Sequence, residues 1–329
     1  MSYIISLIIK MILTVTINPL LERRYLYSRL FFGEGNRNGK TELTAGGKGI
    51  NVSRQLNKFN VENLAFTFLG GTNGKILKDL LNKEKINFTA IRTKSETRDA
   101  ALVFNESDKS LTTFFGPDTI ISDSEADEFK SKLEKIIQNS EIVVFSGSSP
   151  CTQTDSIFSF GIKTANKYDK ISVCDTYGNH LKDCIKAKPT VIHNNVSEVE
   201  KSLNISLNTK KEMLDYLDYL YGSGIKQSFI TNGQYNTYSS NFDFKYEIEN
   251  PEVDAIDSTG SGDSFTAGIV YGLHNNLPYE ESIIIASSLG IVNAARFETC
   301  NVSPGEIEFI KPLIKINAAG KKIKNINVG

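Results

Sequence analysis

Residues 257–268 read DSTGSGDSFTAG, a turn of small residues that leads into a segment with a helical pattern. The turn itself is TGSG (259–262), and apolar side chains recur on one side of the segment after it. A glycine-rich turn that opens a helix presents several backbone N–H groups together with the positive end of the helix dipole. The stretch therefore predicts a binding site for phosphate oxygens at the start of a helix.

Asp263 stands where this helix is expected to begin, so its carboxylate faces the same predicted anion site. A carboxylate beside a bound phosphate is unfavourable for binding alone, but it suits a base that takes a proton from an attacking hydroxyl group. The alternative is an aspartate that only caps a helix after a glycine-rich loop, which is a common arrangement. The stretch by itself leaves both interpretations of Asp263 open.

A second glycine-rich segment, AGGKGIN, occupies residues 45–51. Its three glycines let the backbone approach a ligand closely, while Lys48 supplies a positive charge. A helix is expected to start directly after it, which again favours an anion as the ligand. The segment is not a Walker loop, because no Ser or Thr follows Lys48.

Strand-like apolar runs alternate with helix-like periodic runs along most of the chain. This alternation favours an α/β fold, with a mainly parallel sheet and helices on both of its faces. The expected strands are residues 12–17, 63–70, 141–147, 171–175, 190–195 and 227–233, and the expected helices are 49–59, 75–84, 124–140, 211–224 and 263–275. We expect residues 1–329 to form a single domain.

Two stretches interrupt this alternation, namely residues 28–45 and 88–116. Both carry a period of two, which is typical of half-buried strands. In the second stretch a polar NESDKS turn (105–110) separates two such runs, as in an antiparallel hairpin. We expect the two stretches to form a small β lid outside the main sheet.

The composition excludes several classes of partner and site. The formal net charge of −1 gives no electrostatic reason to expect nucleic acid or an acidic membrane as a partner. The four cysteines, which fit a reducing cytosol, stand too far apart in the sequence to suggest a zinc site or a disulfide framework. The chain is therefore expected to be cytoplasmic.

The apolar N-terminal run, residues 3–17, lacks the basic start and the small-residue cleavage site of a signal peptide. It is also too short to span a bilayer. We expect a buried strand that begins near Met11 after a short extension. Met11 as the native first residue remains an alternative.

Taken together, AGGKGINVSR (45–54) and DSTGSGDSFTAG (257–268) resemble the PfkB/ribokinase family of carbohydrate kinases. Three further segments are similar to the branch that acts on phosphorylated ketohexoses, which contains 1-phosphofructokinase and tagatose-6-phosphate kinase. They are TVTINP (14–19), the Thr-Arg pair of SETRDA (95–100) and NVSE (195–198). The resemblance extends from about Met11 to Val302 and implies a ribokinase-like fold.

The resemblance also implies roles for individual residues. It makes Asp263 the catalytic base, and it makes the N–H groups of Gly260, Ser261 and Gly262 the anion hole. The sugar pocket and the sugar's existing phosphate would be contacted by Glu22, Gly46, Gly47, Lys48, Asn51 and Arg98, with Arg98 reaching from the lid. The nucleotide would be contacted by Asn195, Thr231, Gly233 and Asn293, and Mg²⁺ would be placed by Asn195 and Glu198.

The chain departs from the family pattern at several of these positions. Glu22 stands where the family has an aspartate that holds sugar hydroxyl groups, and His193 stands where it has a lysine. The nucleotide loop ends in Asn236 in place of a glycine, and SGSSPCT (146–152) has lost a proline and a glycine. These departures affect the expected substrate and the rate more than the expected fold.

The predicted function is an ATP- and Mg²⁺-dependent kinase that phosphorylates a hydroxyl group of a ketohexose monophosphate. Fructose-1-phosphate, which would give fructose-1,6-bisphosphate, is favoured over tagatose-6-phosphate. The alternative is a regulatory protein on the same fold that binds sugar phosphate or nucleotide with little turnover, but a mere binder would not need both the base and the anion hole. A dinucleotide-dependent dehydrogenase is excluded, because no G-x-G-x-x-G follows the first strand. A kinase for unphosphorylated sugars or nucleosides remains an alternative, against which Lys48 and Arg98 argue. In this family the lids of two subunits often pair, which implies a homodimer.

Overall fold

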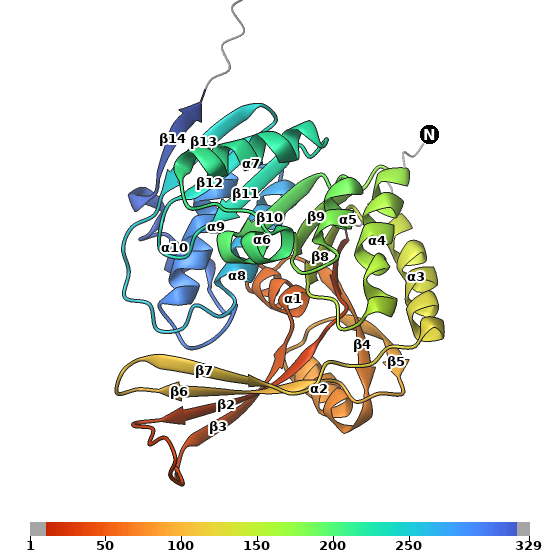
Figure 1. The fold of residues 1–329 in the computed structure, drawn as a ribbon, viewed down its shortest axis with the longest axis vertical. Helices are drawn as coiled ribbons and strands as arrows, with labels where there is room; N and C mark the ends of the chain where they lie inside the picture. Colours follow the sequence, from red (N-terminus) through yellow and green to blue (C-terminus); the bar gives the residue numbers. More distant parts are fainter. Residues whose placement is uncertain (1–10, 321–329) are drawn as a thin grey trace, which may run out of the picture.

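The computed structural model describes residues 11–320, and its centre is a ten-stranded sheet (Figure 1). Its strand order is β14-β13-β12-β11-β10-β9-β8-β1-β4-β5. Neighbouring strands from β5 to β11 pair in parallel, and those from β11 to β14 pair antiparallel, so the expected mainly parallel sheet is confirmed. The strands are β1 (Ile12–Thr16), β4 (Asn63–Gly70), β5 (Phe88–Thr93), β8 (Ile142–Gly147), β9 (Ile171–Thr176), β10 (Val191–Asn195), β11 (Gln227–Thr231), β12 (Thr237–Asn241), β13 (Phe244–Glu249) and β14 (Lys315–Gly320).

Helices cover both faces of this sheet, as expected. The helices are α1 (Lys48–Lys58), α2 (Gly71–Lys83), α3 (Asp123–Gln138), α4 (Ser156–Lys167), α5 (Leu181–Lys186), α6 (Val196–Leu203), α7 (Lys210–Gly222), α8 (Ser261–His274), α9 (Tyr279–Ala294) and α10 (Pro304–Ile307). Helices α3 to α7 pack against one face, whereas α1, α8 and α9 pack against the other.

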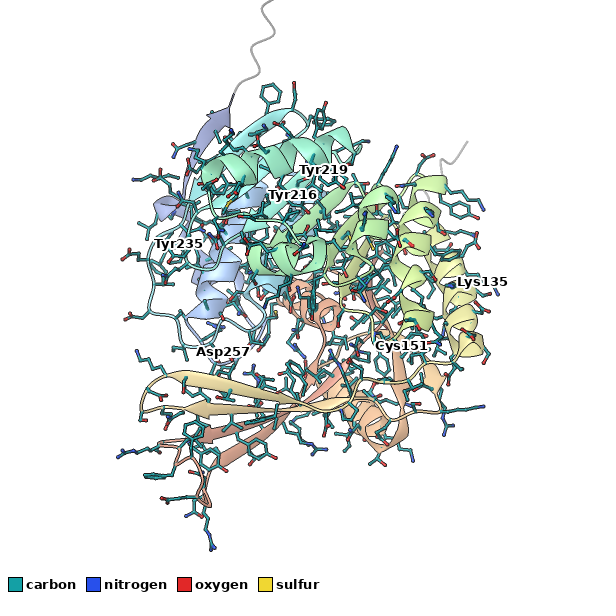
Figure 2. All side chains as sticks on the ribbon, in the orientation of Figure 1. Lys135, Cys151, Tyr216, Tyr219, Tyr235 and Asp257 are labelled. Carbon is teal, nitrogen blue, oxygen red and sulfur yellow. The ribbon has the colours of Figure 1, made fainter. Side chains whose placement is uncertain are left out.

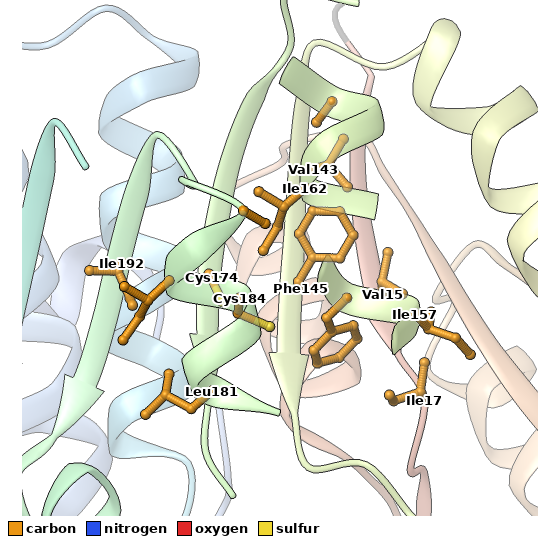
Figure 3. Close-up of a cluster of buried hydrophobic side chains, with 14 of the residues drawn as sticks. Val15, Ile17, Val143, Phe145, Ile157, Ile162, Cys174, Leu181, Cys184 and Ile192 are labelled. Carbon is orange, nitrogen blue, oxygen red and sulfur yellow. The ribbon is translucent and has the colours of Figure 1, made fainter. Parts of the chain in front are cut away.

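Strand β1 shows why both faces need a cover. Leu13 and Val15 belong to the apolar cluster on one face, and Ile12 belongs to the cluster on the opposite face. A central strand that is apolar on both sides is typical of a buried parallel sheet. Figure 3 shows the first of these clusters, in which Val15 and Phe145 from neighbouring strands lie near Ile157 of α4.

A separate four-stranded sheet lies beside this body, with the order β3-β2-β6-β7 (Figure 1). Its strands are β2 (Leu20–Tyr27), β3 (Lys40–Gly46), β6 (Asp99–Asn105) and β7 (Ser110–Phe115). β2 pairs antiparallel with β3 and parallel with β6, and β6 and β7 form the expected hairpin. The chain enters this sheet almost directly from β1, so the two sheets are linked near the end of a central strand.

The structure corrects both expected boundaries of the small sheet. Its first strand begins at Leu20, before the predicted segment 28–45, and Phe88–Thr93 forms β5, which pairs with β4 in the main sheet. Ile91 of β5 is buried in the main core, which explains why this strand joins the larger sheet. A period of two identifies a half-buried strand, but it does not say which sheet the strand joins.

The expectations for residues 1–10 lie outside the described residues. Within residues 11–320, no helix is both long enough and apolar enough to cross a membrane.

Candidate active site

The candidate site lies where several parallel strands of the main sheet end. Asp175 and Thr176 close β9, Asn195 closes β10 and Thr231 closes β11. Ligands of open α/β sheets bind at this carboxyl edge, because the loops and helix starts that follow the strands gather there. The predicted functional residues of β10 and β11 are thus at the expected edge of the sheet.

The predicted anion site is the start of α8. Gly260 precedes the helix with a φ of 78°, a left-handed conformation that suits glycine. In the described structure the backbone N–H groups of Gly260, Gly262 and Asp263 donate to no protein acceptor, but that of Ser261 donates to the carbonyl of Ser258 at 3.1 Å. Among the predicted anion-hole groups, the N–H of Ser261 is thus already engaged, whereas those of Gly260 and Gly262 have no protein acceptor in the described structure.

Asn293 holds this loop from α9. Its Nδ2 donates to the carbonyl of Thr259 at 2.8 Å and to Oγ of Ser261 at 3.1 Å, and its Oδ1 accepts from the N–H of Cys300 at 2.7 Å. The Asn293 side chain is fully buried, and both ends of its amide are engaged. Its hydrogen-bonding groups therefore support the loop, and its contact with the nucleotide stays a prediction.

Asp263 is buried in the first turn of α8. Its Oδ2 accepts a 2.7 Å hydrogen bond from Nδ2 of Asn51 in α1, and Oδ1 of Asn51 in turn accepts from the Arg54 guanidinium. Burial raises the pKa of Asp263 to about 7, even though the positive charge of Lys48 lowers it. A carboxyl group with a pKa near neutral pH is well suited to general base catalysis.

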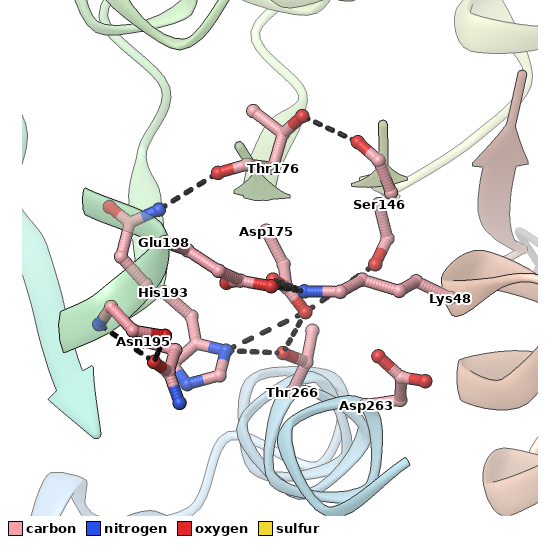
Figure 4. Close-up of polar contacts among 12 residues, drawn as sticks. Lys48, Ser146, Asp175, Thr176, His193, Asn195, Glu198, Asp263 and Thr266 are labelled. Carbon is pink, nitrogen blue, oxygen red and sulfur yellow. Dashed lines mark hydrogen bonds and ion pairs between the residues drawn. The ribbon is translucent and has the colours of Figure 1, made fainter. Parts of the chain in front are cut away.

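Lys48 lies among three carboxylates (Figure 4). Its Nζ is 3.1 Å from Oδ1 of Asp175 and 2.8 Å from Oε1 of Glu198. Burial alone would lower the pKa of Lys48, but Asp175, Glu198 and Asp263 raise it well above its ordinary value. Lys48 therefore remains protonated and reduces the mutual repulsion of these acidic groups.

Asp175 connects Lys48 to the predicted nucleotide loop, although the sequence did not single it out. Its Oδ2 accepts a 3.0 Å hydrogen bond from the Thr266 hydroxyl, and it lies 3.6 Å from Nδ1 of His193. Nε2 of His193 is 3.1 Å from the hydroxyl of Thr231. Burial alone would raise the pKa of Asp175, but Lys48 and His193 lower it overall, so it is a fixed anion. The sequence feature that could have indicated Asp175 is its position as an acidic residue at the end of the apolar strand β9.

Asn195 and Glu198 lie at the start of α6. Oδ1 of Asn195 caps this helix by accepting hydrogen bonds from the N–H and the hydroxyl of Ser197, both at 2.9 Å. Oε1 of Glu198 is paired with Lys48, whereas its buried Oε2 has no partner among the described residues. Gly233 lies just beyond Thr231 with a φ of 57°. Of the predicted nucleotide and metal residues, Glu198 is thus the one linked directly to Lys48.

The predicted sugar residues surround the first strand of the small sheet. Glu22 is buried, and a Cβ atom at Gly46 would lie 2.5 Å from its Oε1, so the glycine makes room for this carboxylate. Gly47 precedes α1 with a φ of 122°, again in the region that favours glycine. Glu22 is not free, because its Oε2 accepts a 3.1 Å hydrogen bond from Nε of Arg24.

Arg98, predicted to contact the sugar's phosphate, is held in this structure by residues of the chain. Its Nη1 is 3.1 Å from Oδ1 of Asp118, and its Nη2 donates to the carbonyl of Asn18 at 3.2 Å, while its buried Nε has no partner among the described residues. No direct contact joins Arg98 to Lys48 within residues 11–320. Nζ of Lys48 is 5.0 Å from the ring centre of Tyr177.

The sequence profile of the pfkB family carbohydrate kinases matches residues 15–305. A tagatose-6-phosphate kinase of Staphylococcus epidermidis is 28% identical over 309 residues, which cover 93% of this chain and 99% of that protein. A crystal structure from Thermotoga maritima, described as a possible 1-phosphofructokinase, superposes with a TM-score of 0.87 at 23% identity and covers 94% of this chain and 99% of the other. The tetrameric inhibited form of Escherichia coli phosphofructokinase-2 superposes with a TM-score of 0.83 at 21% identity, with coverages of 92% and 98%.

Proposed function

Since the chain belongs to the pfkB family of carbohydrate kinases, we propose that it transfers the γ-phosphoryl group of ATP to a hydroxyl group of a ketohexose monophosphate. The observation that carries this proposal is the start of α8. There a buried carboxyl group, Asp263, lies beside the free N–H groups of Gly260 and Gly262. One turn thus contains a base for the sugar hydroxyl group and hydrogen-bond donors for the transferred phosphoryl group.

The proposed reaction uses these groups together. Asp263 takes the proton of the sugar hydroxyl, whose oxygen then bonds to the γ-phosphorus of ATP. The bond from that phosphorus to the β,γ-bridging oxygen breaks, and ADP leaves with the bridging oxygen. The free N–H groups at the start of α8 donate to the non-bridging oxygens, where charge is distributed in the transition state.

The acceptor is proposed to carry a phosphate already. Lys48 and Arg98 come from different parts of the chain. Arg98 donates to Asn18, whose side chain donates to Ser148, and Lys48 lies beside the adjoining Gly147, which supports a common anionic ligand. Fructose-1-phosphate is the expectation from the sequence, and the relative named tagatose-6-phosphate kinase supports tagatose-6-phosphate as the other candidate. The regulatory alternative gains no support from the site, because the base and the free N–H groups occur together.

The proposed cofactors are ATP and Mg²⁺. Glu198 fits the ion, because its buried Oε2 has no partner among the described residues, and magnesium is commonly bound by one or two carboxylates plus phosphates and water. Asn195 fits less well, because its carbonyl oxygen already accepts two hydrogen bonds. Bound Mg²⁺ would neutralise charge on the phosphates of ATP. Thr231 and Gly233 are proposed to border the nucleotide.

We further propose that residues 11–320 act as one domain, with the small sheet as its lid, and that two lids pair in a homodimer. Phe31, Phe32, Phe114 and Phe115 are large exposed apolar side chains on or beside this sheet, and burying some of them would favour an interface. The proposed location is the cytoplasm, which agrees with the free thiols of all four cysteines.

The test is ADP release by the purified protein with Mg-ATP and a panel of acceptors: fructose, fructose-1-phosphate, fructose-6-phosphate and tagatose-6-phosphate. We expect kcat/KM to be highest for one of the phosphorylated ketohexoses. A clear preference for fructose would overturn the proposed acceptor, and no ADP release with any acceptor would favour the regulatory alternative.

A further inference from the structure

Arg24 is a buried cation that joins the small sheet to the body of the protein. It lies in strand β2, yet it contacts two segments of the body: the loop between α9 and α10, and the loop before α8. Its Nη1 donates to the carbonyl of Phe297 at 2.6 Å, and its Nη2 is 3.2 Å from Oδ2 of Asp257 and 2.8 Å from the hydroxyl of Thr299. Its Nε donates to Glu22 on its own strand at 3.1 Å. The guanidinium is thus held on every side.

The partners of Arg24 support the turn that opens α8. Oδ1 of Asp257 accepts the N–H of Thr259 at 2.8 Å, while Oδ2 of the same carboxylate binds Arg24. Thr299 packs closely against Gly260: a Cβ atom added to Gly260 would lie 2.3 Å from Cγ2 of Thr299. Arg24 therefore contacts two separate supports of the free N–H groups. Figure 2 shows Asp257 where the body faces the small sheet.

The charges around Arg24 also matter to a bound phosphate. Glu22 and Asp257 are both buried, and Arg24 is the cation paired with each of them. Without Arg24 the two carboxylates would be left buried and unpaired beside a site that has to accept a phosphoryl group. Unpaired buried charges are costly, and here they would also repel the ligand.

We propose that Arg24 is a positioning residue for phosphoryl transfer. It fixes the turn that holds the transferred group relative to strand β2, which carries Glu22 next to the proposed sugar pocket. Its charge also cancels the repulsion that Asp257 would exert on the phosphate. This inference rests on the proposed function and extends it to a residue that does not touch the reacting atoms.

The experiment compares three variants of the full chain with the wild type. Arg24→Met removes the charge but keeps most of the volume, and Arg24→Lys keeps the charge but offers a single nitrogen. Arg23→Met is the matched control, because Arg23 is the next residue of β2 and pairs elsewhere, with Asp99 and Asn73. Nucleotide binding stoichiometry gives the fraction of correctly folded protein, and kcat is expressed per folded site.

We expect Arg24→Met to lower kcat by roughly 100-fold and Arg24→Lys by roughly 10-fold, with the KM of the sugar nearly unchanged, since transition-state contacts change kcat. Arg23→Met should stay within about 2-fold of the wild type. Adding Asp257→Asn to Arg24→Met should restore part of kcat, because it removes the unpaired charge. Equal kcat values for Arg24→Lys and the wild type would overturn the proposal, even if Arg24→Met does not fold.

Amide hydrogen exchange provides a readout that does not depend on turnover. The amides of Thr259 and Ser261, which donate to Asp257 and to the carbonyl of Ser258, should exchange at least ~10-fold faster in Arg24→Lys than in the wild type, and they should be unchanged in Arg23→Met. Unchanged exchange in Arg24→Lys would overturn the positioning role. If the wild type phosphorylates no sugar, the proposed function fails, but this comparison still decides whether Arg24 holds the turn.

Discussion

The side-chain amide of Asn51 donates a 2.7 Å hydrogen bond to Oδ2 of Asp263, across 212 residues of sequence. This contact joins the two glycine-rich segments in one site, since Asn51 lies in α1 and Asp263 opens α8. It also orients the carboxylate, because Asn51 is itself fixed by Arg54. The carboxyl group that we propose as the base therefore has a defined orientation and a raised pKa.

The raised pKa of Asp263 predicts the pH dependence of the reaction. A base must be deprotonated, so kcat/KM should rise with pH through about 7 and level off above it. The measurement is kcat/KM from pH 5.5 to 9 at saturating Mg-ATP. A rate that stays constant from pH 5.5 to 7.5 would contradict the assignment of the raised pKa to the base.

The same raised pKa affects stability in the opposite direction: activity should rise with pH, but the contribution of Asp263 to stability should fall. The unfolded chain loses this proton near the ordinary pKa of 3.8 and the folded chain only near 7, so the folded state binds more protons between these pH values. The stabilising contribution of Asp263 is therefore present at low pH and is lost as pH rises toward 7. Asp263→Asn, which stays neutral, should have a higher melting temperature than the wild type at pH 8 and a smaller advantage at pH 5.

Glu198 is predicted to determine the requirement for magnesium. Glu198→Gln should raise the Mg²⁺ concentration for half-maximal activity by ~10-fold or more, because the amide keeps the shape but loses the charge. Glu200→Gln on the same helix is the matched control, since Glu200 accepts the N–H of Leu207 and makes no ion pair with Lys48 within the described residues. Excess chelator should abolish the activity of the wild type. Equal magnesium titrations for the two variants would refute the role of Glu198.

Arg98 is predicted to bind the existing phosphate of the sugar in competition with Asp118. Arg98→Ala should raise the KM of the sugar phosphate by a factor that corresponds to about 2 kcal/mol, with the KM of ATP nearly unchanged. Asp118→Asn should lower the KM of the sugar phosphate, because it frees the guanidinium that Asp118 now holds at 3.1 Å. Arg92→Ala, at an exposed position of β5, is the control. A larger effect of Arg98→Ala on ATP than on the sugar would reassign Arg98 to the nucleotide.

Much of the fold could be predicted, because its signals are local. The apolar runs of β4, β8 and β9 and the helical period of α3 and α7 depend on neighbouring residues alone. The assignment of β5 to the main sheet could not be predicted, because it depends on the contact of Ile91 with a distant core. The site shows the same division: the glycine-rich turn and the start of α8 were predictable from local sequence.

The charge pairing within the site was not predictable. Lys48, which we propose to contact the sugar phosphate, is also paired with Asp175 and Glu198, which lie 127 and 150 residues away in sequence. The amide of Asn293, a residue predicted at the nucleotide, also supports the loop before α8. Such roles depend on which polar groups meet in the folded chain, and single-sequence patterns do not contain that information.

The central claim is that Asp263 acts as the base of a sugar-phosphate kinase, and Asp263→Asn tests it most directly. The measurement is single-turnover transfer of γ-labelled phosphate from ATP to the best acceptor of the panel, beside calorimetric titration of ATP and acceptor. The account predicts transfer at least ~1000-fold slower than in the wild type, with both affinities nearly unchanged, because the carboxylate acts mainly in the transition state. Transfer by the asparagine variant within about 10-fold of the wild-type rate would contradict it, since proton transfer to a positioned base should contribute more.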